Sequence, residues 1–214
     1  MSAITDFYFD EASWDKTKPL NPSGYSHFDI VNNWSDEQWE KIHDFIQWVF
    51  PLQEPSNFNP DAPLLSAEDI ALFQSNQDLQ DALFKSFHRF LKFLGLRCRL
   101  SKDGETDANW IVEKIKAGEC GIGDEFFTNA QIEEKMKVWE SPNHNWLRIT
   151  RCLQSLRLLG LEFASTAFFV CLCDLYNTTN VSDVTFDYWS AAAGVNNPIA
   201  QGGVPDELSS GFEV

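Results

Sequence analysis

The sequence predicts an all-α protein, an irregular or orthogonal bundle of about seven helices with an extended N-terminal arm. Apolar residues recur at helical spacing in several segments, most clearly over residues 79–94. Polar residues suited to capping a helix precede several of these segments. Strict alternation of apolar and polar residues is confined to residues 96–101. Helix following helix without a run of strands is the pattern of a helical bundle.

The chain divides into an arm, a body and a tail. Residues 1–33 place aromatic residues among Pro, Asn, Ser and Gly, which predicts an extended arm that lays aromatic anchors on the body. Residues 34–193 contain the helical segments and form the body. Residues 194–214 are rich in Gly, Pro, Asn and Ser, and we expect a flexible tail there.

Capping and stop signals define the first three helices of the body. Ser35 with Gln38 forms a capping box, and this helix should end before Pro51, because the residue before a proline disfavours the helical region. Ser66 caps the second helix. The third runs over residues 78–94 and ends at Gly95.

The remaining elements are assigned in the same way. Residues 96–100 alternate and predict a short extended segment, and a short helix over 110–116 lies among glycines at 104, 118, 121 and 123. Thr128 with Gln131 caps a helix that runs through residue 138. Three further helices are expected over residues 143–159, 163–176 and 182–193.

Charge and cysteine content restrict the class of protein. The net charge of −16 opposes binding to nucleic acid or to an anionic membrane by the molecule as a whole. Five cysteines without zinc-site spacing indicate free thiols in a reducing, cytoplasmic compartment. No apolar run reaches the roughly 18 residues that a membrane span needs. Because no phosphate-cradling loop or metal motif is present, we expect no cofactor and no metal.

Two motifs carry a family resemblance. HDFIQWVFPL occupies residues 43–52, and NHNWLRITRCL occupies 143–153, followed by LLGLE at 158–162. Their order resembles the conserved region of the opioid growth factor receptor family, over residues of about 30 to 193. The vertebrate relatives are described as intracellular and nuclear-associated, and as binding an enkephalin-type growth peptide and restraining cell proliferation. The resemblance implies the same location for this domain.

The two motifs supply the candidate ligand-binding residues. These are His43, Asp44, Trp48, Phe50, His144, Asn145, Trp146, Arg148 and Arg151. Arg148 and Arg151 share a helix face, and a guanidinium fork suits carboxylate or phosphate. The two arginines either form structural ion pairs with Asp44, Glu54 or Glu162, or hold the anionic end of a ligand.

A second candidate is a basic stretch without acidic residues. Its members are Lys85, Arg89, Lys92, Arg97 and Arg99. They are either a solvated surface whose charges pair with acidic neighbours, or an anion patch for a phosphorylated ligand, an acidic peptide or RNA.

Three functions remain open from the sequence. The first is a non-catalytic module that binds a peptide or protein partner, with a cationic, aromatic peptide as one candidate, in a groove near Trp48, Phe50, Trp146 and Arg148. The second is a small-molecule enzyme of cyclase or isomerase type, with an aromatic-lined cavity for an apolar or phosphorylated ligand. The third is a structural or regulatory domain without a ligand. We expect the protein not to be an enzyme.

Overall fold

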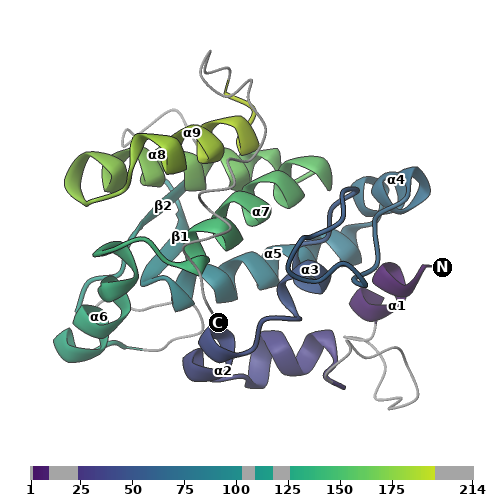
Figure 1. Ribbon diagram of the computed structural model, residues 1–214, viewed down its shortest axis with the longest axis horizontal. Coiled ribbons are helices and arrows are strands. Elements are labelled where there is room, and N and C mark those ends of the chain that lie inside the picture. The colour runs from purple at the N-terminus through teal and green to yellow at the C-terminus, as the bar shows by residue number, and fades with distance from the viewer. Residues whose placement is uncertain (1, 10–23, 103–108, 118–125, 196–214) are drawn as a thin grey trace.

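The computed structural model describes residues 2–9, 24–102, 109–117 and 126–195 (Figure 1). The described chain is mostly helical and confirms the predicted fold class, with one two-stranded antiparallel sheet in addition. No helix in these ranges is long and apolar enough to cross a membrane. The tail from residue 196, Cys120, and the glycines at 104, 118, 121 and 123 lie outside the described residues.

The elements follow one another in a simple order. They are α1 (Ala3–Phe9), the π-helix η2 (Asp29–Asn33), α2 (Asp36–Lys41), α3 (Ile46–Val49), α4 (Ala67–Ser75), α5 (Gln77–Phe93), β1 (Leu96–Leu100), β2 (Trp110–Lys114), α6 (Asn129–Met136), the 3-10 helix η3 (Lys137–Trp139), α7 (His144–Leu158), α8 (Glu162–Thr178) and α9 (Asp183–Ala192).

The predicted helix starts are confirmed by their caps. Ser35, Ser66 and Thr128 each form a complete capping box. Asn143 and Ser182 cap α7 and α9 by accepting a hydrogen bond from a backbone N–H in the first turn. These helices start where the sequence predicts because a cap needs only residues that are neighbours in the chain.

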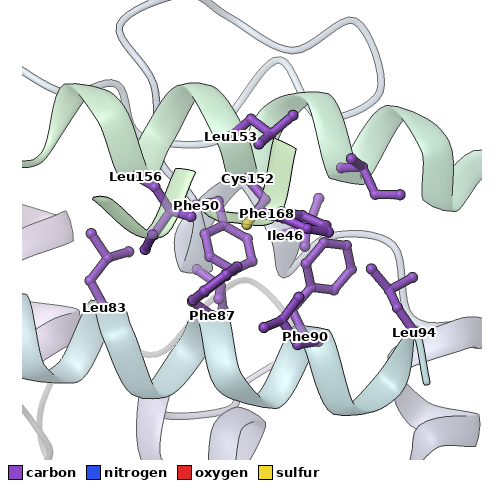
Figure 2. Close-up of a cluster of buried hydrophobic side chains, with 14 of the residues drawn as sticks. Ile46, Phe50, Leu83, Phe87, Phe90, Leu94, Cys152, Leu153, Leu156 and Phe168 are labelled. Atoms are coloured by element: carbon purple, nitrogen blue, oxygen red, sulfur yellow. The ribbon is translucent and has the colours of Figure 1, made fainter. Parts of the chain in front are cut away.

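The core lies between α5 and α7. Figure 2 shows Phe87 and Phe90 of α5 directed toward Cys152 and Leu156 of α7, with Phe50 between the two helices. All five side chains are fully buried. The apolar stripe of α5 therefore faces α7, and the short α3 segment fills the space between them.

The N-terminal arm differs from the expectation, because residues 3–9 form a helix rather than an extended segment. Ile4, Phe7 and Tyr8 have helical spacing and are buried against α5 and its neighbours. The Tyr8 hydroxyl also donates to the Val49 carbonyl. Phe7 and Tyr8 pack on the body from a helix, since helical spacing aligns them with Ile4 on one face, whereas Phe28 is exposed.

The single helix predicted over residues 35–50 is wrong, because the chain breaks between α2 and α3. Ile42 is extended, with φ −91° and ψ 128°. The Trp39 and Ile42 carbonyls accept hydrogen bonds from Arg148 of α7. A partner from another helix therefore satisfies backbone groups that an unbroken helix would have paired internally.

The short helix predicted over residues 110–116 is also wrong, because residues 110–114 form β2. This strand pairs antiparallel with β1, with Leu96 opposite Lys114 and Cys98 opposite Val112. Cys98 and Val112 are buried on the same face of the hairpin. β-Branched residues and non-local pairing therefore override a weak helical pattern.

Candidate functional site

The two sequence motifs meet where α7 passes the break between α2 and α3. Arg148 Nη1 donates to the Trp39 carbonyl at 2.6 Å and to Asn145 Oδ1 at 3.0 Å, and Nη2 donates to the Ile42 carbonyl at 3.0 Å. Arg148 is only 5 % exposed. Burial lowers its pKa to about 10, and the nearby Glu40 charge opposes this change. The guanidinium thus ties α7 to the broken helix.

Arg151 and Ser155 extend this connection along α7. Arg151 Nε donates to the Phe50 carbonyl at 2.8 Å, and the Ser155 hydroxyl donates to the Pro51 carbonyl at 3.0 Å. The two motif segments therefore pack together. Burial lowers the pKa of Arg151 to about 10, and the charge of Glu54 opposes this.

The expected carboxylate partners of the arginines are wrong. The hydrogen bonds of Arg148 and Arg151 go to backbone carbonyls and an amide oxygen, rather than to Asp44, Glu54 or Glu162. The break in the first motif and the turn at Pro51 leave carbonyls without helical partners. A buried guanidinium with several N–H groups satisfies such carbonyls well.

A polar cluster lies beside Arg148, as the sequence predicted for His43, His144 and Asn145. Asn145 Nδ2 donates to Glu40 Oε2 at 2.9 Å, and His144 Nε2 lies 3.4 Å from Glu40 Oε1. The rings of His43 and His144 are 4.9 Å apart. Asp44 contributes its backbone carbonyl, which accepts from Asn59 Nδ2.

Both imidazoles of this cluster are neutral at pH 7. Burial, followed by the charge of Arg148, lowers the pKa of His144 to about 4. The same causes, in the same order, lower the pKa of His43. No group of three or more metal-ligating side chains within the described ranges could hold a metal ion. The contacts of Glu40 with His144 and Asn145 connect α2 with α7.

The aromatic residues of the motifs are mostly buried. Trp48, Phe50 and Trp146 are 7 %, 0 % and 4 % exposed. Trp146 donates from its indole nitrogen to the Val138 carbonyl at 3.0 Å and packs edge-on against Trp189. Trp48 and Phe50 therefore form part of the core, and Trp146 also lines a small hollow of about 20 Å³ between α7 and α9.

The predicted basic patch is divided between two places. On the hairpin, Arg97 Nη2 lies 2.6 Å and Arg99 Nε lies 2.8 Å from the same carboxylate oxygen of Glu113. Hydrogen bonds from both arginines lower the pKa of Glu113. Arg97 and Arg99 thus form a cross-strand ion cluster, as the plainer interpretation expected.

Arg89 and Lys92 line a surface cleft of about 470 Å³. Lys85, on the same helix, is not among its lining residues. The lining residues come from η2, the start of α2, α5, and α6 with the residue Phe127 before it. They are Val31, Asn32, Trp34, Ser35, Asp36, Arg89, Lys92, Phe127, Gln131, Glu134 and Lys135.

Charged groups meet on the wall of this cleft. Arg89 Nη2 lies 2.9 Å from Asp36 Oδ1, and Lys135 Nζ pairs with the other oxygen of Asp36. The ammonium groups of Lys135 and Lys92 lie 5.4 Å and 6.0 Å from the centre of the Phe127 ring. Burial lowers the pKa of Lys135, Asp36 opposes this, and Arg89 and Lys92 lower it further. Arg89 and Lys135 thus pair with the Asp36 carboxylate, and Lys92 and Lys135 lie near the Phe127 ring.

The sequence analysis missed Asp36, Phe127 and Lys135 as site residues. A capping box correctly predicted the helix that carries Lys135, and Asp36 follows the cap of another helix. Lys135 and Asp36 are 99 positions apart in the chain. Local patterns place each residue on its helix but contain no signal for the meeting of the two helices.

Comparisons with known proteins support the resemblance. The family model described as the opioid growth factor receptor (OGFr) conserved region matches residues 6–117, which include the first motif but not the second. The human opioid growth factor receptor is 35 % identical over 143 residues, which are 66 % of this chain and 18 % of that protein. The mouse receptor is 31 % identical over 145 residues, 67 % of this chain and 20 % of the receptor.

A further relative is opioid growth factor receptor-like protein 1 of Xenopus tropicalis, 30 % identical over 146 residues, 67 % of this chain and 24 % of that protein. The chain thus matches about a fifth of the length of these relatives. No solved structure matches the chain. Since the family model covers more than half of its residues, the chain belongs to the opioid growth factor receptor conserved-region family.

Proposed function

We propose that this chain is a non-catalytic helical module that binds a peptide or protein partner in the cleft between η2, α2, α5 and α6. The observation that carries the proposal is the composition of the cleft wall. Charges of both signs stand beside the apolar Val31 and the hydrogen-bonding Asn32 and Gln131. A peptide offers matching groups, since it has charged ends, amides and apolar side chains.

The packing of the interior supports a module rather than an enzyme with an internal cavity. The buried aromatic rings of α5 contact rings of neighbouring elements, as Phe87 does with Phe168 and Phe90 with Phe50. Figure 2 shows side chains from both helices filling this region. The name of the related receptors, which refers to an opioid growth factor, also favours a peptide or protein partner.

Isothermal titration calorimetry with a panel of short aromatic peptides, some basic and some acidic, tests the proposal. The blocking variant is Asn32→Trp, because Asn32 lines the cleft and a bulky ring there fills it. The matched control is Asn33→Trp, since Asn33 is the next residue of the same π-helix, is exposed, and is not among the lining residues.

We expect a peptide of the panel to bind the parent protein and the Asn33→Trp variant with the same Kd. Asn32→Trp should weaken binding at least tenfold. Equal affinity for both variants would place the binding site elsewhere, and a panel without any binding peptide would argue against the proposed function.

A further inference from the structure

Three cationic side chains from two helices approach one point in the cleft. Arg89 and Lys92 are three positions apart on α5 and therefore share a face, and Lys135 reaches them from α6. The Arg89 and Lys135 side chains are each 9 % exposed. Lys92 is partly exposed, so it is the member of the group that a ligand reaches most directly.

The structure already shows this group holding a carboxylate. Asp36 accepts from Arg89 with one oxygen and from Lys135 with the other. A guanidinium has five N–H donors and an ammonium group has three, and Arg89 also donates to the Trp34 carbonyl at 3.0 Å. The Phe127 ring, with the two ammonium groups near it, provides an apolar surface beside the donors.

The electrostatics of Lys135 favour a second anion. Burial is the largest cause of the lowered pKa of Lys135, the positive charges of Arg89 and Lys92 lower it further, and Asp36 acts in the opposite direction. An oxyanion bound beside Lys135 would offset this repulsion and would raise the pKa of the ammonium group. The surrounding chain has a net charge of −16, so the attraction must come from these local contacts rather than from the whole molecule.

We infer that Arg89, Lys92 and Lys135 bind an oxyanion of the partner, a phosphate ester or a carboxylate, next to the Phe127 ring. This inference rests on the proposed function, and it specifies the chemistry that the same cleft recognises. Arg suits the planar edge of an oxyanion, and Lys supplies a compact charge that adapts to its position. The partner would thus carry a phosphorylated or acidic residue within a segment that fits the cleft.

The first test is a titration of the protein with inorganic phosphate at constant ionic strength, followed by NMR of the lysine side chains. We expect saturable shifts at Lys92 and Lys135 and an increase in the pKa of Lys135. Lys92→Met should abolish the saturable response. Lys85→Met is the matched control, because Lys85 is an exposed lysine of the same helix outside the cleft, and it should leave the response unchanged.

The second test distinguishes the source of the oxyanion. Three versions of a peptide, with Ser, phosphoserine or Glu at one position, are compared by calorimetry with the parent, Lys92→Met and Lys85→Met proteins. We expect phosphoserine or Glu to strengthen binding at least tenfold over Ser, and Lys92→Met to remove this advantage. The version with the larger gain identifies a phosphate ester or a carboxylate as the preferred group.

The outcomes separate the two proposals. Equal binding of all three peptides in the cleft would overturn the oxyanion inference and leave the proposed function intact. Saturable phosphate binding without any peptide binding would keep the anion site and contradict the proposed function. Phosphate shifts that are equally large at Lys85 and Lys92 would show a diffuse surface effect and overturn the inference. Circular dichroism of each variant verifies that it is folded.

Discussion

At the scale of single residues, the hydrogen bonds of Arg148 contribute most to joining the two family motifs. Arg148 connects α7 to the carbonyls of Trp39 and Ile42 at the end of α2, where the chain breaks before α3. It is a strongly basic side chain in a nearly fully buried position, held by neutral acceptors. These contacts are structural. A structural role was one of the two interpretations from the sequence, but the partners expected there were carboxylates.

We expect Arg148→Met to lower the free energy of unfolding by about 2–5 kcal/mol, because it leaves two buried carbonyls without a partner. Arg157→Met is the control on the same helix, where the side chain is exposed, and should change it by less than about 0.5 kcal/mol. Urea denaturation of both variants measures the difference. Similar midpoints for the two variants would contradict the assigned role.

His27 makes the stability of the protein depend on pH. Ser86 donates its hydroxyl to the Ala82 carbonyl, so His27 Nε2, 2.7 Å away, is the donor to Ser86 Oγ. Its Nδ1 is buried and has no hydrogen-bond partner among the residues that the structure describes. Burial, followed by the charge of Lys85, lowers the pKa of His27 to about 3. The folded protein therefore holds this imidazole neutral.

Because this pKa is lower in the folded than in the unfolded protein, the unfolded chain binds more protons below pH 6.5. Stability should be full above about pH 6.5 and should fall as the pH is lowered toward 3, by at most about 4 kcal/mol from His27. His27→Gln should reduce this slope, whereas the exposed His43→Gln should reduce it less. Urea midpoints measured from pH 7 to pH 4 provide the comparison, and parallel curves for parent and His27→Gln would refute the expectation.

At the scale of elements, the turn from α5 into β1 allows α6, which carries Lys135, to approach the cleft. Gly95 has a φ of +75° and lies where α6 approaches. A Cβ at this position would lie 3.1 Å from the Cβ of Lys135 and 3.3 Å from the sulfur of Met136. The Gly95 carbonyl also accepts from the Ile115 amide, which closes the hairpin. One glycine thus permits α5, the hairpin and α6 to come together.

Gly95→Ala should destabilise the protein by about 2 kcal/mol, from left-handed backbone strain together with crowding against α6. Gly24→Ala is the matched control, since Gly24 has a φ of +82° and no atom within 4 Å of the added Cβ. It should lose about 1 kcal/mol from strain alone. Thermal unfolding compares the two, and an equal loss would show that the contact with α6 is unimportant.

At the scale of the whole molecule, one hydrophobic core spans the parts of the chain inside and outside the family match. It includes α5, which lies inside the match, and α7, α8 and α9, which lie outside. Figure 1 shows α7 and α8 lying beside α5 and the hairpin. The apolar side of α5 contacts both parts of the chain, since Phe90 packs on Phe50 and Phe87 packs on Phe168.

A fragment of residues 1–117 should therefore fail to fold, although it contains the whole matched region. Without α7 and α8, Phe87 would lose its contact with Phe168, and the α7 side of the core would be exposed to water. The burial that remains among the elements before residue 117 should not offset the entropy of ordering. Far-UV circular dichroism and the dispersion of a nitrogen–proton NMR spectrum, compared with the full chain, provide the measurement. A cooperative transition of the fragment would show that this region is a separate domain.

The sequence by itself determined the family, the fold class and most helix boundaries. Capping boxes, stop signals such as Pro51, and the stripe of α5 act between residues a few positions apart, so they can be read along the chain. The capped starts of α2, α4, α6, α7 and α9 were all predicted in this way.

Only the tertiary structure decided the α2–α3 break, the hairpin partner of β1, the acceptors of Arg148 and the cleft at Lys135. Each of these depends on groups brought together from distant positions, as with Lys135 and Asp36. A backbone carbonyl is present at every residue, so its availability to Arg148 cannot be read from residue types. Local patterns determine which helices form, and the packing of those helices determines which side chains meet.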